Sequence, residues 1–162
     1  MITRFHGIDR HKNYSTIAVL NCKGEEIDFK QRCTDLKGYI QGLGTEDAVI
    51  MEASTGAFYW DDRVESRGAQ CYIIDPHKFR IIKDSWNKND KHDSRNMGKA
   101  LWVYLITGEF GIPEVYKPEM VIRELRKLFS QYQLLNPKNQ DVEKQHPCGS
   151  VREWHRWQKR GE

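Results

Sequence analysis

Residues 4–33 read RFHGIDRHKNYSTIAVLNCKGEEIDFKQRC. This stretch contains three runs with apolar or alternating character, at 4–8, 15–20 and 26–33, and polar residues separate them. The dipeptide Lys23-Gly24 is a hairpin signal between the second run and the third. The stretch therefore predicts three consecutive antiparallel β-strands at the start of the chain.

Strands and helices alternate after residue 33. The short apolar runs at 48–51 and 70–74 have the pattern of buried strands. Capping residues and apolar periodicity predict helices at 35–43, 55–67, 76–83, 89–106 and 118–135. A strand meander followed by alternating helices and strands predicts an α/β fold. We expect a mixed sheet with helices on both of its faces and a long helix after it. RNase H-like (RuvC-like) folds have this order of elements, and so do other folds.

The predicted elements suggest three regions. We expect one domain over residues 1–110 and a linker helix over 111–136, because Ile112-Pro113 interrupts the chain between them. Residues 137–162 contain few aliphatic side chains, and we expect them to be disordered or foreign to the domain.

Composition excludes some classes of protein. The chain has 162 residues, 26 of them basic and 23 acidic, with a net charge of +3. No apolar run approaches the ~18 residues that span a membrane, and no signal peptide opens the chain. No pair of its 4 cysteines has CxxC spacing, which argues against a zinc knuckle and for free thiols. We therefore expect a cytoplasmic protein.

Four acidic residues stand at unusual positions. Asp9 ends the first apolar strand, Glu52 ends the run at 48–51, and Asp90 and Asp93 lie three apart, on one face of a helix. Carboxylates at the ends of central strands lie where open α/β sheets hold ligands. Because converging carboxylates repel one another, they favour hard divalent cations such as Mg²⁺, which can promote phosphodiester cleavage.

Simpler interpretations of these acids exist. Asp9 is also suited to capping a turn, and Asp90 and Asp93 are also suited to the first turn of any helix. We interpret the further acidic pair Asp61-Asp62 as a solvated helix face.

Three segments together resemble the DEDD transposases. They are GIDRHK at 7–12, MEASTG at 51–56 and KNDKHDS at 88–94, and the resemblance covers roughly residues 5–135. These are bacterial insertion-sequence transposases with a RuvC-like N-terminal domain, and members act as bridge-RNA-guided recombinases. The resemblance implies that Asp9, Glu52, Asp90 and Asp93 bind Mg²⁺, or Mn²⁺ in its place, and cleave DNA. It further implies DNA and a guide RNA as partners, and a homo-oligomer formed through a coiled coil near 118–135.

The sequence departs from the family pattern at several places. Ser94 replaces the usual Ala, and Gly98 replaces a helix former, which should cost about 1 kcal/mol of helix stability. The family's second domain, which carries a serine for strand exchange, has no counterpart up to Glu162. We therefore expect a truncated copy of the transposase.

Basic residues surround the acidic segments. Lys12 lies beside the first, and a basic run leads into the Asp pair with Phe79 and Trp86 among them. This mixture suits contacts with a nucleic-acid backbone and stacking on bases. The alternative is a buried Phe79 with solvated lysines around it. The predicted nucleic-acid contacts are Lys12, Lys78, Arg80, Lys83, Lys88 and Lys91.

Three other functions are compatible with the same features. One is a Holliday-junction-type endonuclease of the same fold, and another is a non-catalytic nucleic-acid-binding remnant. The third is an ATP-binding domain of the actin and sugar-kinase kind, which also begins with a hairpin and an Asp. That class uses a glycine-rich phosphate loop, whereas Arg10 follows Asp9 in this chain.

Overall fold

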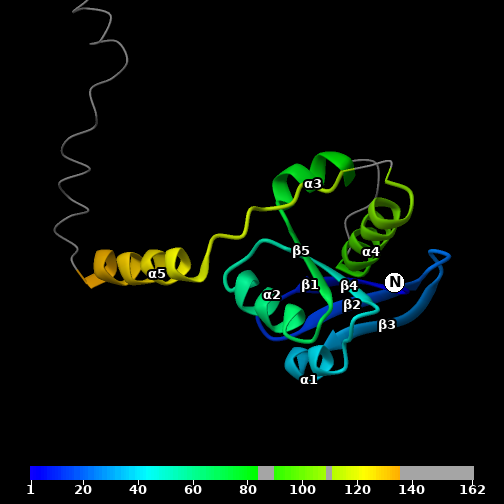
Figure 1. Ribbon diagram of the computed structural model, residues 1–162, viewed down its shortest axis with the longest axis horizontal. Helices are drawn as coiled ribbons and strands as arrows, with labels where there is room; N and C mark the ends of the chain where they lie inside the picture. The colour runs from blue at the N-terminus through cyan, green and yellow to red at the C-terminus, as the bar shows by residue number, and fades with distance from the viewer. Residues whose placement is uncertain (84–89, 109–110, 136–162) are drawn as a thin grey trace, which may run out of the picture. The chain divides into compact units, whose positions relative to one another are not determined.

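The computed structural model describes residues 1–83, 90–108 and 111–135, and at 80–83 and 90–92 it describes the backbone alone (Figure 1). One compact unit spans Met1–Tyr116, and a second begins at Lys117. The first unit extends past residue 110 because the chain after it pairs with strand β5 (Gln70–Ile74), where the Val115 amide donates to the Ile73 carbonyl. The tail expected at 137–162 lies outside the described residues.

The first unit contains a five-stranded mixed sheet. Its order is β3-β2-β1-β4-β5, with β1 antiparallel to β2, β2 antiparallel to β3, and β4 parallel to both β1 and β5. The meander and the two buried strands predicted from the sequence are therefore confirmed. The other strands are β1 (Arg4–Arg10), β2 (Ser15–Asn21), β3 (Glu26–Cys33) and β4 (Asp47–Glu52).

Four helices belong to the first unit and one to the second, among the residues described. Asp35 caps the first helix by accepting a hydrogen bond of 2.8 Å from the Gly38 amide, as its residue type predicts. Gly56 precedes the second helix in the left-handed region, at φ 79°, which favours glycine. The helices are α1 (Leu36–Gln41), α2 (Ala57–Glu65), α3 (Pro76–Lys83), α4 (Asp90–Ile106) and α5 (Met120–Leu135).

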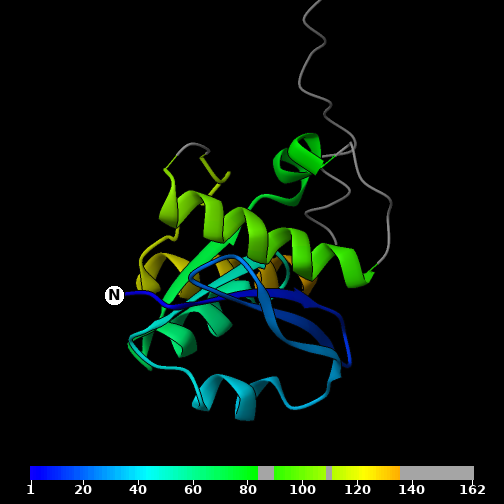
Figure 2. The ribbon, with the colours of Figure 1, turned by 90° about the vertical axis from the view of Figure 1, so that its right-hand side faces the viewer.

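Helices cover both faces of the sheet (Figures 1 and 2). On one face, side chains of β1, β2, β4 and β5 form a core with α1 and α2, around Ile8, Val49 and Met51. On the other face, alternate residues of the same strands form a second core with α3 and α4. The second core consists of Phe5, Leu20, Ala48, Ile50, Ile74, Phe79, Met97 and Leu101.

Helix α4 lies directly against the backbone of β1. A Cβ atom added at Gly7 would overlap the carbonyl oxygen of Ser94, so no larger residue fits there without movement. Gly98 approaches from the helix side, and a Cβ at that position would lie 3.5 Å from the Gly7 amide nitrogen and 3.3 Å from Leu20 Cδ1. Glycine at position 98 lowers the helix propensity of this turn, but the absence of a side chain lets the helix pack closely on the strand.

The direction of α4 follows from these contacts. Gly98 lies over Leu20, whose register partner on β1 is Phe5, whereas Ser94 lies over Gly7. The helix therefore runs back along β1, as Figure 2 also shows. As a result, the first turn of α4 lies toward the end of β1 that carries Asp9.

We expect Gly7→Ala to lower the free energy of unfolding by about 1–3 kcal/mol, because the added methyl group must displace the Ser94 carbonyl. Urea denaturation measures this change. Gly44→Ala is the matched control, since a Cβ at Gly44 meets no atom within 4 Å. A Gly7→Ala protein as stable as the control would contradict the close contact.

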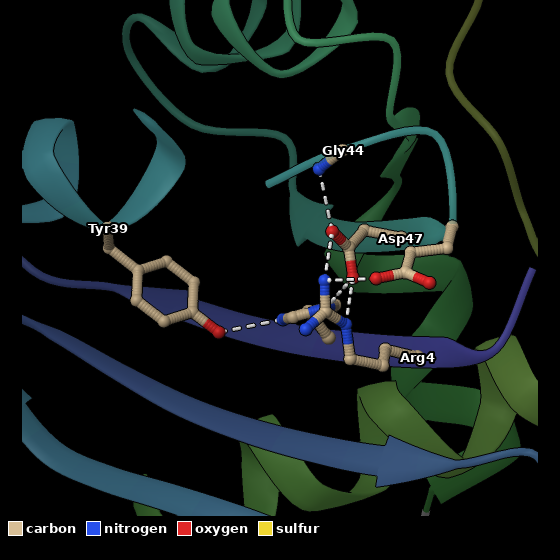
Figure 3. Close-up of polar contacts among 6 residues, drawn as sticks. Arg4, Tyr39, Gly44 and Asp47 are labelled. Atoms are coloured by element: carbon tan, nitrogen blue, oxygen red, sulfur yellow. Dashed lines mark hydrogen bonds and ion pairs between the residues drawn. The ribbon is translucent and has the colours of Figure 1, made fainter. Parts of the chain in front are cut away.

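A buried polar cluster joins β1 and β4 at their opposite end (Figure 3). The fully buried Asp47 accepts hydrogen bonds from Arg4 Nε at 2.6 Å, from the Gly44 amide at 2.7 Å, and from His6 Nε2 at 2.9 Å. His6 Nδ1 lies 2.7 Å from the Tyr39 hydroxyl. A proton on His6 Nε2 lets this nitrogen donate to Asp47, and the other ring nitrogen is used in the contact with the tyrosine hydroxyl.

The cluster sets the charge of Asp47. Burial raises the pKa of this carboxyl, but the hydrogen bonds from His6, Arg4 and Gly44 outweigh burial and lower the pKa to about 2. Because the pKa is below the ordinary value of 3.8, the carboxylate stabilises the folded state above pH ~4, by about 2 kcal/mol. That contribution is lost as the pH falls from ~4 toward 2.

Asp47→Asn should therefore lower the free energy of unfolding at pH 7 by about 2 kcal/mol or more, and the difference from wild type should shrink between pH 4 and 2. Denaturation series at several pH values test this. Glu124→Gln serves as the control, since Glu124 is exposed on α5 and an exposed surface charge contributes little. A difference for Asp47→Asn that does not depend on pH would contradict the assignment.

Candidate functional site

Asp9 and Glu52 end neighbouring parallel strands. The register of β1 and β4 pairs Ile8 with Met51, so Asp9 and Glu52 are the next residues on the two strands. Because side chains alternate along a strand, Asp9 lies on the same face as Gly7, the face covered by α4. Glu52 lies on the same face as Ile50, which belongs to the core between the sheet and α4. Both acidic residues are half-buried. The two carboxyl groups therefore share one edge and one face of the sheet.

Asp93 comes to this edge from a third element. It lies in the first turn of α4, is half-buried, and immediately precedes Ser94, whose carbonyl covers Gly7. Since Asp9 is two residues beyond Gly7 on the same face, the start of α4 lies over that end of β1. Asp90 is the first residue of α4, and its side chain is outside the described part of the chain.

His11 contacts Asp9 directly. Its Nε2 lies 3.2 Å from Asp9 Oδ2, and its ring lies 4.4 Å from the ring of Tyr14, measured between centroids. The structure therefore places the His11 ring between the first candidate ligand, Asp9, and the aromatic ring of Tyr14.

The candidate ligands share an edge but do not form a tight cluster. Among the residues described, the three-residue acidic group whose ligand oxygens lie within 4.8 Å of one another is Asp61, Asp62 and Glu65. Asp9, Glu52 and Asp93 do not form such a group. Like charges on carboxylates oppose a close approach, and a divalent cation is the partner that relieves this repulsion.

The position of Asp61 corrects our interpretation of a solvated helix face. Its side chain is 3% exposed, because it follows Ala57 by four residues and precedes Val64 by three on the buried side of α2. That spacing was visible in the sequence and could have revealed the burial. With Asp62 and Glu65, Asp61 forms an acidic triad that could hold a metal ion.

The predicted nucleic-acid contacts are placed in part. Lys12, in the turn between β1 and β2, and Lys78, on α3, are exposed. Arg80, Lys83 and Lys91 lie on helices whose backbone alone is described there, and Lys88 and Trp86 lie outside the described residues. Phe79 is only 3% exposed and packs in the core with α4, so the proposed stacking role for Phe79 is wrong.

Two broader expectations can also be compared with the structure. Cys22, Cys33 and Cys71 are free thiols, as predicted. In the part of the chain that is described, no helix has the length and apolar character required to span a membrane.

Neither the family models nor the curated proteins searched contain a match to this chain.

Proposed function

We propose that the chain is a metal-dependent DNA-cleaving domain of the DEDD transposase kind, with an RNase H-like fold. The observation that carries this proposal is the convergence of Asp9, Glu52 and Asp93 on one edge of the sheet from three separate elements. The strand order β3-β2-β1-β4-β5, in which a three-stranded meander is followed by two parallel strands, supports the same assignment.

The donor set suits a hard divalent cation. Asp9, Glu52 and Asp93, together with Asp90, provide carboxylate oxygens, the ligands that Mg²⁺ and Mn²⁺ prefer. Such a cation, when bound, neutralises charge on the attacking and leaving oxygens of a phosphodiester. His11 orients the Asp9 carboxylate through their 3.2 Å contact. The exposed Lys12 and Lys78 provide positive charge for the phosphates of DNA or of a DNA–RNA assembly.

The alternatives have weaker support. A Holliday-junction-type endonuclease would use the same carboxylates, so only the preferred DNA substrate distinguishes it. An ATP-binding domain of the actin and sugar-kinase kind requires a flexible glycine loop after β1. That turn instead carries the side chains of His11 and Tyr14, whose rings pack together.

Asp9→Asn and Glu52→Gln should each reduce Mg²⁺- or Mn²⁺-dependent cleavage of branched or linear DNA by about 100-fold or more, because each removes a charged cation ligand. Gel assays of the full chain with each metal measure the rate. DNA binding in EDTA should remain, which separates loss of chemistry from loss of the fold.

Asp62→Asn is the control for this experiment, because it removes a carboxylate from the acidic triad of α2 and leaves the sheet edge intact. We expect cleavage by this variant to match wild type. Equal activity in the wild type and Asp9→Asn would disprove the proposal. Loss of activity in Asp62→Asn alone would move the metal site to the triad. DNA binding without cleavage in any protein would favour the non-catalytic remnant.

Helix α5 supports the proposed homo-oligomer. Its apolar side chains at 121, 125, 128, 132 and 135 follow the alternating four- and three-residue spacing of a coiled-coil seam. All five are exposed, from 54% at Tyr132 to 81% at Leu135. A seam of this kind is best covered by the same helix of a second copy, because the spacing matches itself.

The double substitution Leu125→Glu and Leu128→Glu should convert an oligomer into a monomer, because it places charges in the seam. Light scattering after gel filtration, at several protein concentrations, measures the mass. Ser130→Glu is the control, since residue 130 lies opposite the seam and the variant places a negative charge on the same helix outside it. A wild-type chain that is monomeric at every concentration would contradict the role of α5.

A further inference from the structure

The first unit contains a hollow at the same edge of the sheet as the candidate carboxylates. Its volume is about 200 Å³. Its walls are the turn from β1 to β2, the end of β3, the start of α1, and Trp60 from α2. Arg10, which follows Asp9 and faces the opposite side of the sheet, also lines the hollow. The hollow is therefore adjacent to the candidate site but is formed by different side chains.

Positive charge predominates in the walls of the hollow. Arg10, Lys12 and Lys37 line it, against the single carboxylate of Asp35, which accepts a hydrogen bond from the Gly38 amide. Arg10 is held in place, since its Nη2 donates to Ser54 Oγ at 2.9 Å and also to the Thr55 carbonyl. Lys12 and Lys37 are exposed and free to follow an anionic chain. This arrangement favours a phosphate-containing ligand.

Two aromatic side chains, Trp60 and Tyr14, line the same hollow. Trp60 is half-buried and packs partly against the core, so its position is fixed by the fold. The guanidinium of Arg32 lies 5.0 Å from the ring centroid of Tyr14. Aromatic rings beside cationic groups are the combination with which proteins bind unpaired bases and their phosphates.

His11 connects the hollow to the carboxylate edge. It lines the hollow, its ring packs on Tyr14, and its Nε2 reaches Asp9. A nucleotide in the hollow would therefore have its neighbouring phosphate close to Asp9. This continuity favours a polynucleotide strand over a free mononucleotide, which would need no route to the carboxylates.

We propose that this hollow binds an unpaired nucleotide of the DNA strand, adjacent to the phosphate that is cleaved. Trp60 stacks on the base, and Tyr14, whose ring is packed by His11 and Arg32, borders the base at its edge. Arg10, Lys12 and Lys37 contact the flanking phosphates. The inference rests on the proposed function for the identity of the ligand, and it adds that the substrate is single-stranded at this point.

The test is binding of a fluorescent oligothymidylate to the full chain in EDTA, measured by anisotropy over a range of salt concentrations. Trp60→Leu keeps an apolar side chain but removes the stacking ring, and should weaken binding by about 10-fold or more. Lys37→Ala should weaken binding and reduce the magnitude of the log–log salt slope by about 0.7, as expected for one lost phosphate contact. Circular dichroism verifies that each variant is folded.

Lys23→Ala is the matched control, because Lys23 is exposed in the turn between β2 and β3 and does not line the hollow. Its binding and salt slope should equal those of wild type. If Trp60→Leu binds as wild type does, or if Lys23→Ala weakens binding as much as Lys37→Ala, the proposal is overturned. Stronger binding of oligouridylate or of free thymidine monophosphate would overturn it as well.

The outcome is separable from that of the cleavage experiment. Stacking that depends on Trp60, without cleavage that depends on Asp9, would retain the nucleotide site and reject the nuclease. Cleavage that depends on Asp9, with binding insensitive to Trp60 and Lys37, would reject the nucleotide site alone.

Discussion

The contact between Gly7 and the backbone of α4 determines how the first unit is arranged. Because a side chain at Gly7 would overlap the Ser94 carbonyl, the helix can lie on the strand only where glycine is present. Gly98 allows the same approach from the other side. The contact fixes both the height of α4 above the sheet and the position of its first turn. Asp93 thereby reaches the edge where β1 and β4 end.

Strand β1 organises two polar regions of opposite character. At its beginning, Arg4 and His6 hold the buried carboxylate of Asp47, whose hydrogen-bonding capacity is used within the fold. At its end, Asp9 is half-buried beside His11 and near other acidic residues. The first arrangement is typical of a structural group, because each buried polar atom has a partner that stabilises it. The second brings acidic side chains to one edge of the sheet, where a divalent cation would offset their mutual repulsion.

Most elements of the fold could be predicted from the sequence because their signals are local, such as the Lys23-Gly24 turn, the Asp35 cap and the apolar runs of β4 and β5. The meeting of Asp9 and Glu52 at one edge followed from their positions at strand ends. Other features could not be predicted, because they join distant segments: the His6–Asp47 hydrogen bond links residues 41 positions apart, and the hollow combines three separate stretches. The burial of Phe79 depends on α4, which comes later in the chain.

The two edge strands of the sheet, β5 and β3, differ in how their outer sides are covered. Beside β5, residues 112–115 supply an antiparallel bridge from Glu114 to Ile74. Among the described residues, β3 pairs with β2 on one side, and this strand carries charged residues of both signs: Glu26, Asp28, Lys30 and Arg32. Charges on an open strand edge discourage other chains from adding strands to it. The sheet is thereby protected against edge-to-edge aggregation, and specific assembly is left to surfaces outside it.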